Sequence, residues 1–162
     1  MKNHYIAIKN SRIHNKGIFA RKYIPEGTKV IEYIGDKVTK TESDIRWERH
    51  LKEAKKNKNN GVVYLFELNK KYDIDGNVSY NTARLINHSC SPNCEAEIIK
   101  GKIWVIAIKN IKKGEEITYN YCYDFEDWKD HPCKCGSGNC IGYILDEKYW
   151  SKLKKVLKNE VR

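Results

Sequence analysis

The chain has 162 residues, of which 40% are hydrophobic and 11% aromatic, and its 31 Lys and Arg against 21 Asp and Glu give a formal charge of +10. This length suits one compact domain with its own core, and the 10 glycines and 3 prolines exclude collagen-like and low-complexity chains. Because no run of about 18 apolar residues occurs and the first apolar stretch is too short for a secretory signal, we expect an intracellular protein without a membrane span.

Short segments of strand-like composition recur along the chain, separated by turn residues. They cover residues 5–9, 29–34, 62–68, 71–75, 97–99, 103–108 and 116–121. The turn Lys100-Gly101-Lys102 between two of them is typical of a β-hairpin. So many short strands with glycine-bearing turns predict a mainly β protein.

Two segments are predicted to be helical. Polar residues 41–44 can cap a helix that forms an insert over about 41–60. Its apolar residues are Ile45, Trp47, Leu51 and Ala54. The second helix lies at the C-terminal end and has lysines opposite its apolar face, which we expect to pack on its own domain. That face is formed by Trp150, Leu153, Val156, Leu157 and Val161.

One short internal repeat is present. Residues 20–30 and 107–117 both read Ala-x-Lys-x-Ile-x-x-Gly and carry an apolar residue at the eleventh position. Gly27 and Gly114 suit a turn that needs a positive φ, so each copy is expected to be a turn that leads into a strand.

The cysteines cluster late in the chain, which in an intracellular protein indicates metal ligands or reactive thiols rather than disulfides. Cys133, Cys135 and Cys140 lie within eight residues around a glycine-rich turn, so the backbone can bring three thiols to one centre. A structural zinc site needs four ligands. The candidates for the fourth are Cys90, Cys94, Cys122 and His131.

A second polar cluster, Asn87-His88-Ser89-Cys90, follows an apolar pair. His88 and Cys90 are two residues apart, so on a strand they share a face and leave no room for a substrate between base and nucleophile. A small-molecule site that lends Cys90 to the metal therefore fits better than a cysteine nucleophile.

Three tyrosines alternate at positions 119, 121 and 123. They would point to one side if the strand continued through them. Taken alone, this row of phenols predicts an ordinary half-buried strand face.

Together these stretches resemble the SET-domain protein-lysine methyltransferases, followed by the post-SET zinc-binding tail of that family. The resemblance runs from about residue 5 to residue 144, and its motifs occur in family order. They are residues 13–20, 32–35, 84–94, 114–121 and 133–144. The resemblance implies the mainly β, SET-type β-clip fold, with several small sheets around a pseudoknot, a short inserted helix and a C-terminal helix. With it, the chain divides into a SET domain over 1–125 and a post-SET segment over 129–145, and the amphipathic pattern predicts the C-terminal helix over 146–162.

The resemblance also implies S-adenosyl-L-methionine as the methyl donor. By similarity, the residues that would bind it are His14, Asn15, Lys16, Gly17, Tyr64, Arg84, Asn87, His88, Tyr143 and Ile144. Zinc would order the tail, so that Tyr143 and Ile144 cover the adenine. The zinc ligands would be Cys90, Cys133, Cys135 and Cys140.

The implied reaction moves a methyl group to a lysine ε-amine that must first lose its proton. With an unperturbed pKa near 10.4, about one lysine in a thousand is neutral near pH 7.4, a deficit of about 4 kcal/mol. A dry aromatic channel beside a sulfonium lowers that pKa. The resemblance places Tyr121 at the catalytic position, Tyr119 beside it, and Tyr64 in the substrate channel. The family associates Tyr at the position of Tyr119 with fewer methyl groups, which predicts mainly mono- or dimethylation.

The expected partner is a protein that presents a lysine, and a histone or histone-like tail would fit. The basic charge would also permit contact with nucleic acid, although the reaction does not require it. The expected location is the nucleus or chromatin, in a eukaryotic cell or in a eukaryotic host that receives the protein. Asn15 and Asn120 depart from the family's commoner Gly and Asp.

Two other functions compete with this hypothesis. One is a SET-like scaffold that binds basic or nucleic-acid partners through its charge without catalysis. It is disfavoured by the presence of Tyr121, Asn87, His88 and Tyr64. The other is a zinc-stapled DNA-binding module, which is disfavoured because the lysines of the last helix are scattered rather than arranged for base contacts.

Overall fold

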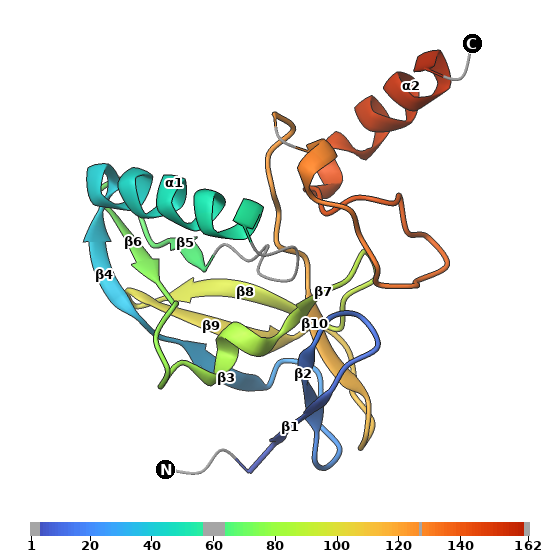
Figure 1. The fold of residues 1–162 in the computed structure, drawn as a ribbon. Coiled ribbons are helices and arrows are strands. Elements are labelled where there is room, and N and C mark those ends of the chain that lie inside the picture. The colour runs from blue at the N-terminus through green and yellow to red at the C-terminus, as the bar shows by residue number, and fades with distance from the viewer. Residues whose placement is uncertain (1–3, 57–63, 127, 161–162) are drawn as a thin grey trace. The chain divides into compact units, whose positions relative to one another are not determined.

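The computed structural model describes residues 4–56, 64–126 and 128–160 (Figure 1). The strands are β1 (Ile6–Asn10), β2 (Lys16–Ala20), β3 (Lys29–Tyr33), β4 (Asp36–Thr39), β5 (Leu65–Glu67), β6 (Tyr72–Asp75), β7 (Asn87–His88), β8 (Cys94–Ile99), β9 (Lys102–Ala107) and β10 (Glu116–Tyr119). The α-helices are α1 (Lys40–Lys56) and α2 (Trp150–Glu160), and the 3-10 helices are η1 (Thr82–Leu85), η2 (Trp128–Asp130) and η3 (Glu147–Tyr149). No helix in these described ranges has the length and apolar composition needed to cross a bilayer.

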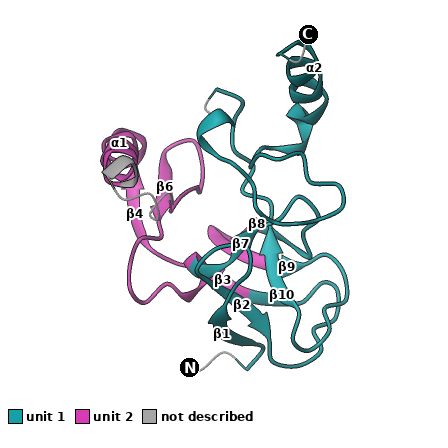
Figure 2. Cartoon of the chain, turned by 45° about the vertical axis from the view of Figure 1, so that its right-hand side comes forward, with its two compact units in different colours: residues 1–30, 85–96, 106–162 teal, residues 31–84, 97–105 magenta. Residues whose placement is uncertain are grey.

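The strands form three small sheets, with orders β1-β2-β10-β7, β3-β9-β8 and β4-β6-β5. The prediction of a mainly β fold with several small sheets is therefore confirmed. Figure 2 shows two compact units, residues 1–30, 85–96 and 106–162 in the first and residues 31–84 and 97–105 in the second. The first sheet and α2 belong to unit 1, whereas the third sheet and α1 belong to unit 2. The three strands of the second sheet each pass from one unit into the other.

The predicted hairpin is confirmed, since β8 and β9 are neighbours in their sheet. Lys100 and Gly101 have φ angles of 50° and 75°, the left-handed pair that a two-residue hairpin turn needs. Three strands, β2, β4 and β7, were not predicted. β4 is rich in charge and β7 has two residues, so neither carries the alternating apolar pattern on which a strand prediction depends.

The predicted insert helix exists, but its cap was misplaced. Helix α1 begins at Lys40, and the hydroxyl of Thr39 accepts a hydrogen bond from the Glu42 backbone N–H at 3.3 Å. Thr39 therefore caps the helix instead of residues 41–44. Residues 57–60 of the expected insert, and residues 62 and 63 of the strand expected over 62–68, lie outside the described residues.

The two copies of the sequence repeat pair with each other inside unit 1. Ile24 and Ile111 exchange backbone hydrogen bonds, both at 2.9 Å. The Gly27 N–H donates to the Ala107 carbonyl at 2.8 Å, and the Gly114 N–H donates to the Ala20 carbonyl at the same distance. Equivalent residues thus make equivalent bonds, as in a local two-fold arrangement. Because one copy leaves β2 and the other enters β10, this pairing fixes the two strands beside each other.

Helix α2 packs on its own unit, as the sequence predicted, although Val161 of the predicted apolar face lies outside the described residues. Its Leu153 has no exposed surface and joins the buried Trp128 and Leu145 in a small apolar core, which we call the tail core. The Trp150 indole N–H donates to the Leu145 carbonyl at 3.2 Å. The chain from 128 to 145, which carries the clustered cysteines, is therefore held at both ends by apolar packing.

Replacing Leu153 by alanine should lower the free energy of unfolding by about 3 kcal/mol, because it leaves a cavity in the tail core. Urea denaturation measures this change. The matched control is K155A, an exposed position on the same helix, which should stay within about 0.5 kcal/mol of the wild type. Equal, small changes in both variants would show that α2 does not stabilise the tail.

Candidate active site and metal centre

Four cysteines of unit 1 converge on one point. The sulfur atoms of Cys90, Cys133, Cys135 and Cys140 lie within 4.8 Å of one another. Cys90 Sγ is 3.8 Å from Cys133 Sγ and 3.9 Å from Cys140 Sγ. Tetrahedral zinc with Zn–S bonds of about 2.3 Å places its sulfurs about 3.8 Å apart, so the donor set fits such an ion. Among the residues that the structure describes, Cys94, Cys122 and His131 do not join this group.

The environment of these thiols differs from one to the next. Burial raises the pKa of Cys90 to about 12 and also raises that of Cys133. Burial acts on Cys135 too, but hydrogen bonds from the Cys90 backbone N–H and the Ser137 hydroxyl outweigh it and lower the pKa to about 6. One thiol is thus ready to ionise, and a cation would displace the protons of the others.

The Asn87 side chain binds the loop that precedes β2. Asn87 is buried on β7, and its Nδ2 lies 3.3 Å from the His14 carbonyl, 3.2 Å from the Lys16 carbonyl and 2.8 Å from Glu116 Oε1. Asn15 has a φ of 40°, a left-handed angle that asparagine tolerates better than most residues. The structure therefore brings residues 14–17 against Asn87, as the candidate cofactor site requires.

Three supporting residues were missed by the sequence reasoning. Glu116 Oε2 accepts a hydrogen bond from the Ser11 hydroxyl at 2.9 Å. Asn93 donates through Nδ2 to the Glu116 carbonyl at 2.8 Å and accepts from the Thr118 N–H at 2.9 Å. Asn93 thus binds the backbone of β10 at Glu116 and Thr118 through its side-chain amide. Its position one residue after Pro92 was the signal available in the sequence.

The rings of Tyr119, Tyr121 and Tyr123 form a contiguous row, although the strand ends before Tyr121. Strand β10 stops at Tyr119, and Cys122 has a φ of 54°. The ring centroids of Tyr119 and Tyr121 are still 5.0 Å apart, and those of Tyr121 and Tyr123 are 5.7 Å apart. Tyr119 is buried and the other two are half-buried. The Tyr121 hydroxyl donates to the Ile86 carbonyl at 2.8 Å.

Strand β7 places the polar cluster that begins at Asn87 beside strand β10, which leads into the tyrosine row. It pairs in parallel with β10, with Asn87 opposite Thr118 and His88 opposite Tyr119. The His88 ring is buried, which lowers its pKa to about 4, so the imidazole is neutral. Its Nδ1 accepts from the Tyr121 N–H at 3.3 Å and its Nε2 lies 3.6 Å from Cys90 Sγ. Both ring nitrogens are therefore engaged within the protein.

Tyr143 and Ile144 belong to the tail of unit 1. The Tyr143 ring packs edge-on against Trp128, with centroids 4.5 Å apart, and the Tyr143 carbonyl is 4.0 Å from Cys90 Sγ. The Ile144 N–H donates to the His131 carbonyl at 2.8 Å. The position of both residues thus depends on the same tail that carries three of the cysteines.

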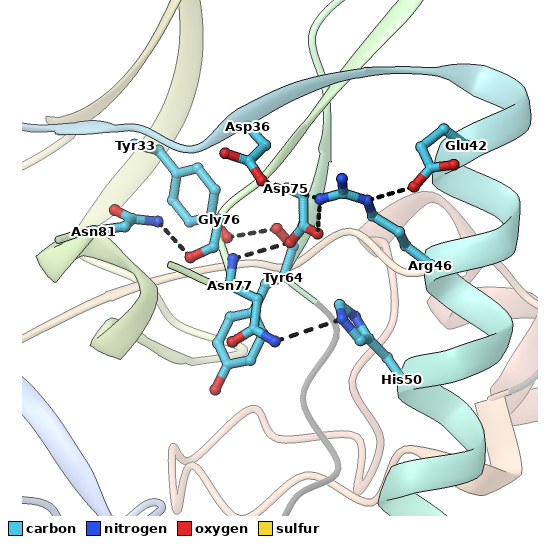
Figure 3. A network of polar contacts seen from close by, with 10 residues as sticks. All are labelled: Tyr33, Asp36, Glu42, Arg46, His50, Tyr64, Asp75, Gly76, Asn77 and Asn81. Carbon is cyan, nitrogen blue, oxygen red and sulfur yellow. Dashed lines mark hydrogen bonds and ion pairs between the residues drawn. The ribbon is translucent and has the colours of Figure 1, made fainter. Parts of the chain in front are cut away.

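Tyr64 and Arg84, the two predicted site residues of unit 2, contact each other. The Arg84 guanidinium lies over the Tyr64 ring, 5.8 Å from its centroid. The Tyr64 carbonyl accepts from the Tyr33 hydroxyl at 2.8 Å and from the Gly76 N–H at 2.9 Å. Figure 3 shows Tyr64 within this network, with His50 of α1 close to its ring. The backbone of Tyr64 is thereby tied to β3 and to the end of β6.

Comparison with known proteins identifies the family. The SET domain profile matches residues 15–122, about two thirds of the chain. The chain belongs to the SET-domain family. The prediction from the motifs is therefore confirmed, and β2, β7, β10, Tyr119 and Tyr121 all lie within the matched SET domain.

Curated relatives of this SET domain include much longer proteins. The chain is 42% identical over 143 residues to histone-lysine N-methyltransferase 2D of Homo sapiens. The aligned part covers 85% of this chain and 2% of that protein. It is 40% identical over 138 residues to the H3 lysine-4 specific histone-lysine N-methyltransferase of Schizosaccharomyces pombe, covering 83% and 14%. It is 37% identical over 145 residues to the histone-lysine N-methyltransferase trithorax of Drosophila virilis, covering 86% and 4%. The chain thus spans a small part of the length of these relatives.

Gly17 is required by close packing within the SET domain. A Cβ at this position would lie 2.2 Å from Glu116 Oε1 and 3.1 Å from Asn87 Nδ2. Gly17→Ala should therefore displace Glu116 and Asn87 and weaken binding of S-adenosyl-L-methionine at least about tenfold, a cost of about 1.4 kcal/mol. Calorimetry measures the affinity. G138A is the control, because a Cβ there meets nothing within 4 Å. Unchanged affinity in G17A would show that the loop over 14–17 does not contact the cofactor.

Arg46 holds the insert helix α1 on its sheet in unit 2. Its Nη1 lies 2.8 Å from Asp75 and 3.2 Å from Asp36, and its Nε lies 2.9 Å from Glu42 (Figure 3). The hydrogen bonds to Asp75 and Glu42 raise the pKa of Arg46 above its ordinary value. The Asp75 side chain is 7% exposed, so it needs this cation.

Arg46→Ala should lower the free energy of unfolding by about 2–3 kcal/mol, since it leaves the Asp75 carboxylate buried without its partner. This value is below that of a fully buried pair because the Arg46 side chain is 24% exposed. K52A on the same helix breaks an exposed pair with Glu48 and should cost about 0.5 kcal/mol or less. Equal losses in urea denaturation would contradict a special role for Arg46.

Proposed function

We propose that this SET domain transfers methyl groups from S-adenosyl-L-methionine to the ε-amine of a protein lysine. The observation that carries the proposal is the parallel pairing of β7 with β10. It sets the candidate cofactor residue Asn87 and the tyrosines after Thr118 side by side within one unit. The names of the relatives, which are histone-lysine N-methyltransferases, support the same activity.

The donor set of unit 1 fits the amino-acid end of the cofactor. That end carries an ammonium and a carboxylate, and the loop offers carbonyl oxygens at His14 and Lys16 beside the exposed Lys16 cation and the Asn87 amide. When bound, the cofactor supplies an activated methyl group on a sulfonium. The residues of unit 1 proposed to hold it are His14, Asn15, Lys16, Gly17, Asn87, His88, Tyr143 and Ile144. Tyr64 and Arg84 are proposed as cofactor residues from the resemblance to the family alone.

The tyrosines are proposed to prepare the lysine amine. Because the Tyr121 hydroxyl donates its hydrogen to the Ile86 carbonyl, its oxygen keeps lone pairs that can accept from the amine and orient it. A ring such as that of Tyr119 can hold the cationic stem against its face and exclude water, which lowers the pKa of the amine. The resemblance to the family is the ground for proposing Tyr64 as a substrate-channel residue. A hydroxyl at Tyr119 also takes space beside the amine, so the expected products are mono- and dimethyllysine.

The four cysteines are proposed to bind one zinc ion, which would tie Cys90 to the tail. Tetrahedral thiolate sites are typical of structural zinc, and a site without an open ligand position supplies order rather than chemistry. The tail that this ion orders carries Tyr143 and Ile144, so zinc would complete the cofactor site.

The proposed substrate is a protein that presents an accessible lysine, in the first place a histone tail. The relatives named as H3 lysine-4 specific make the H3 tail the first substrate to test. A charge of +10 repels a basic tail, and a substrate already bound to nucleic acid would relieve that repulsion. Such a substrate would place the protein on chromatin, in its own cell or in a host cell.

The test is methyl transfer from isotopically labelled S-adenosyl-L-methionine to histones, to nucleosomes and to an H3 tail peptide. The control is the same peptide with lysine-4 replaced by arginine. Label recovered as mono- and dimethyllysine is expected, and loss of label from the control peptide would assign the site. No transfer to any of these substrates, together with no cofactor binding by calorimetry, would overturn the proposal and favour a non-catalytic scaffold.

A further inference from the structure

The His88 ring contacts two parts of unit 1, namely the backbone of Tyr121 and the cysteine cluster. On one side, Nδ1 accepts from the backbone N–H of Tyr121 at 3.3 Å, and the two rings meet edge-on with centroids 5.4 Å apart. On the other side, Nε2 lies 3.6 Å from the sulfur of Cys90. The His88 residue is 3% exposed, so water does not compete for either contact.

The first contact determines the second. A ring nitrogen that accepts from a backbone N–H carries no hydrogen of its own, so Nδ1 holds none in this geometry. The ring hydrogen is therefore on Nε2, where it points toward Cys90 Sγ. Hydrogen bonds of this kind to a metal ligand orient the ligand and reduce the charge on its sulfur, which tunes metal binding.

The backbone of Tyr121 needs such support. Strand β10 ends at Tyr119, and Cys122 adopts a φ of 54°, so Tyr121 lies in irregular chain between them. His88 itself is fixed by its place opposite Tyr119 in the β7–β10 pair. The ring thus contacts both Cys90 of the cysteine cluster and the backbone of Tyr121, which lies past the end of the strand.

We propose that His88 is a positioning residue that couples the cysteine metal centre to the backbone of Tyr121. The importance of Tyr121 rests on the proposed function, whereas the coupling itself does not. Two substitutions each remove one of the two contacts and keep the other. Asn places its amide where Nδ1 lies, so H88N keeps an acceptor for the Tyr121 N–H and loses the donor to Cys90. Gln reaches the position of Nε2, so H88Q keeps the donor to Cys90 and loses the acceptor.

The experiment uses the full chain without cofactor or substrate, so its outcome is independent of the enzymatic activity. Zinc affinity is measured by competition with a chelator. The Tyr121 amide is followed in protein labelled with ¹⁵N-tyrosine, in which Tyr121→Phe assigns its signal. H88N is expected to bind zinc about 10-fold more weakly, and H88Q to keep the affinity of the wild type. H4Q, at an exposed histidine, should match the wild type in both measurements.

Exchange of zinc for cadmium tests the coupling in the unaltered chain. In the wild type it is expected to shift the Tyr121 amide signal, and in H88N and H88Q this shift should be lost. A Tyr121 signal that does not respond to the metal in the wild type would overturn the proposal even if neither variant folds. Wild-type zinc affinity in a folded H88N would overturn it as well.

Discussion

Replacing Tyr121 by phenylalanine is expected to lower the rate of methyl transfer by about 100-fold or more, within the range that a positioned general acid or base contributes. The substitution removes one oxygen, which we propose orients the lysine amine. The ring remains, so its contacts with Tyr119 at 5.0 Å and with His88 at 5.4 Å between centroids should persist. Cofactor affinity should therefore stay near that of the wild type, and the loss should appear in kcat.

Tyr123→Phe is the matched control, because it also removes one hydroxyl from the same row of rings. Tyr123 packs between Tyr121 and His131, with centroids 5.7 Å and 4.6 Å away. Its ring is the part that these contacts use, so Y123F should retain most of the activity. A similar loss of kcat in both variants would show that the packing of the row, rather than the Tyr121 oxygen, governs the reaction. Full activity in Y121F would remove Tyr121 from the proposed mechanism.

The sequence predicted the family and the fold class because the motifs are local and dense. A residue such as Asn87 stands in a run of four polar residues after an apolar pair, and three cysteines lie within eight residues. Spacing alone could not choose the fourth member of the cysteine group among four candidates, since that choice depends on how β7 lies relative to the tail. Resemblance to the family supplied Cys90, and the sulfur distances of 3.8 Å and 3.9 Å now support it.

The rest of the site could not be predicted because its contacts join residues far apart in the chain. Ser11 and Glu116 are 105 residues apart, and neither stands out in the sequence as a buried partner of the other. Similarly, the repeat was visible in both copies, but nothing in either copy says that Ile24 pairs with Ile111. Such contacts arise only when distant parts of the chain fold together. For the same reason a two-residue strand such as β7 has no signal of its own, although it positions the site.

Loss of Cys90 should affect the metal binding and order of the tail most. Cys90→Ala removes one of four proposed metal ligands and the link between β7 and the segment over 133–140. Loss of a hydrogen-bond partner to a metal ligand can lower metal affinity by up to about 100-fold. Loss of the ligand itself should lower the zinc affinity by more than that. Metal analysis and chelator competition measure this loss, and limited proteolysis should show faster cleavage within 129–145. Methyl transfer should fall with it, because Tyr143 and Ile144 lie on the same segment.

Cys94→Ala separates metal binding from the loss of a buried thiol. Cys94 has no exposed surface, and burial raises its pKa to about 12, so it resembles Cys90 in both respects. It lies outside the sulfur cluster, however, and should lose about 1 kcal/mol of stability while keeping a full complement of zinc. The tail core of Trp128, Leu145 and Leu153 is apolar and contains none of the cysteines, so C90A should remain folded while its tail opens near the cysteines. Equal zinc content in C90A and C94A would contradict the assignment of Cys90, and global unfolding of C90A would show that the metal holds more of unit 1 than the tail.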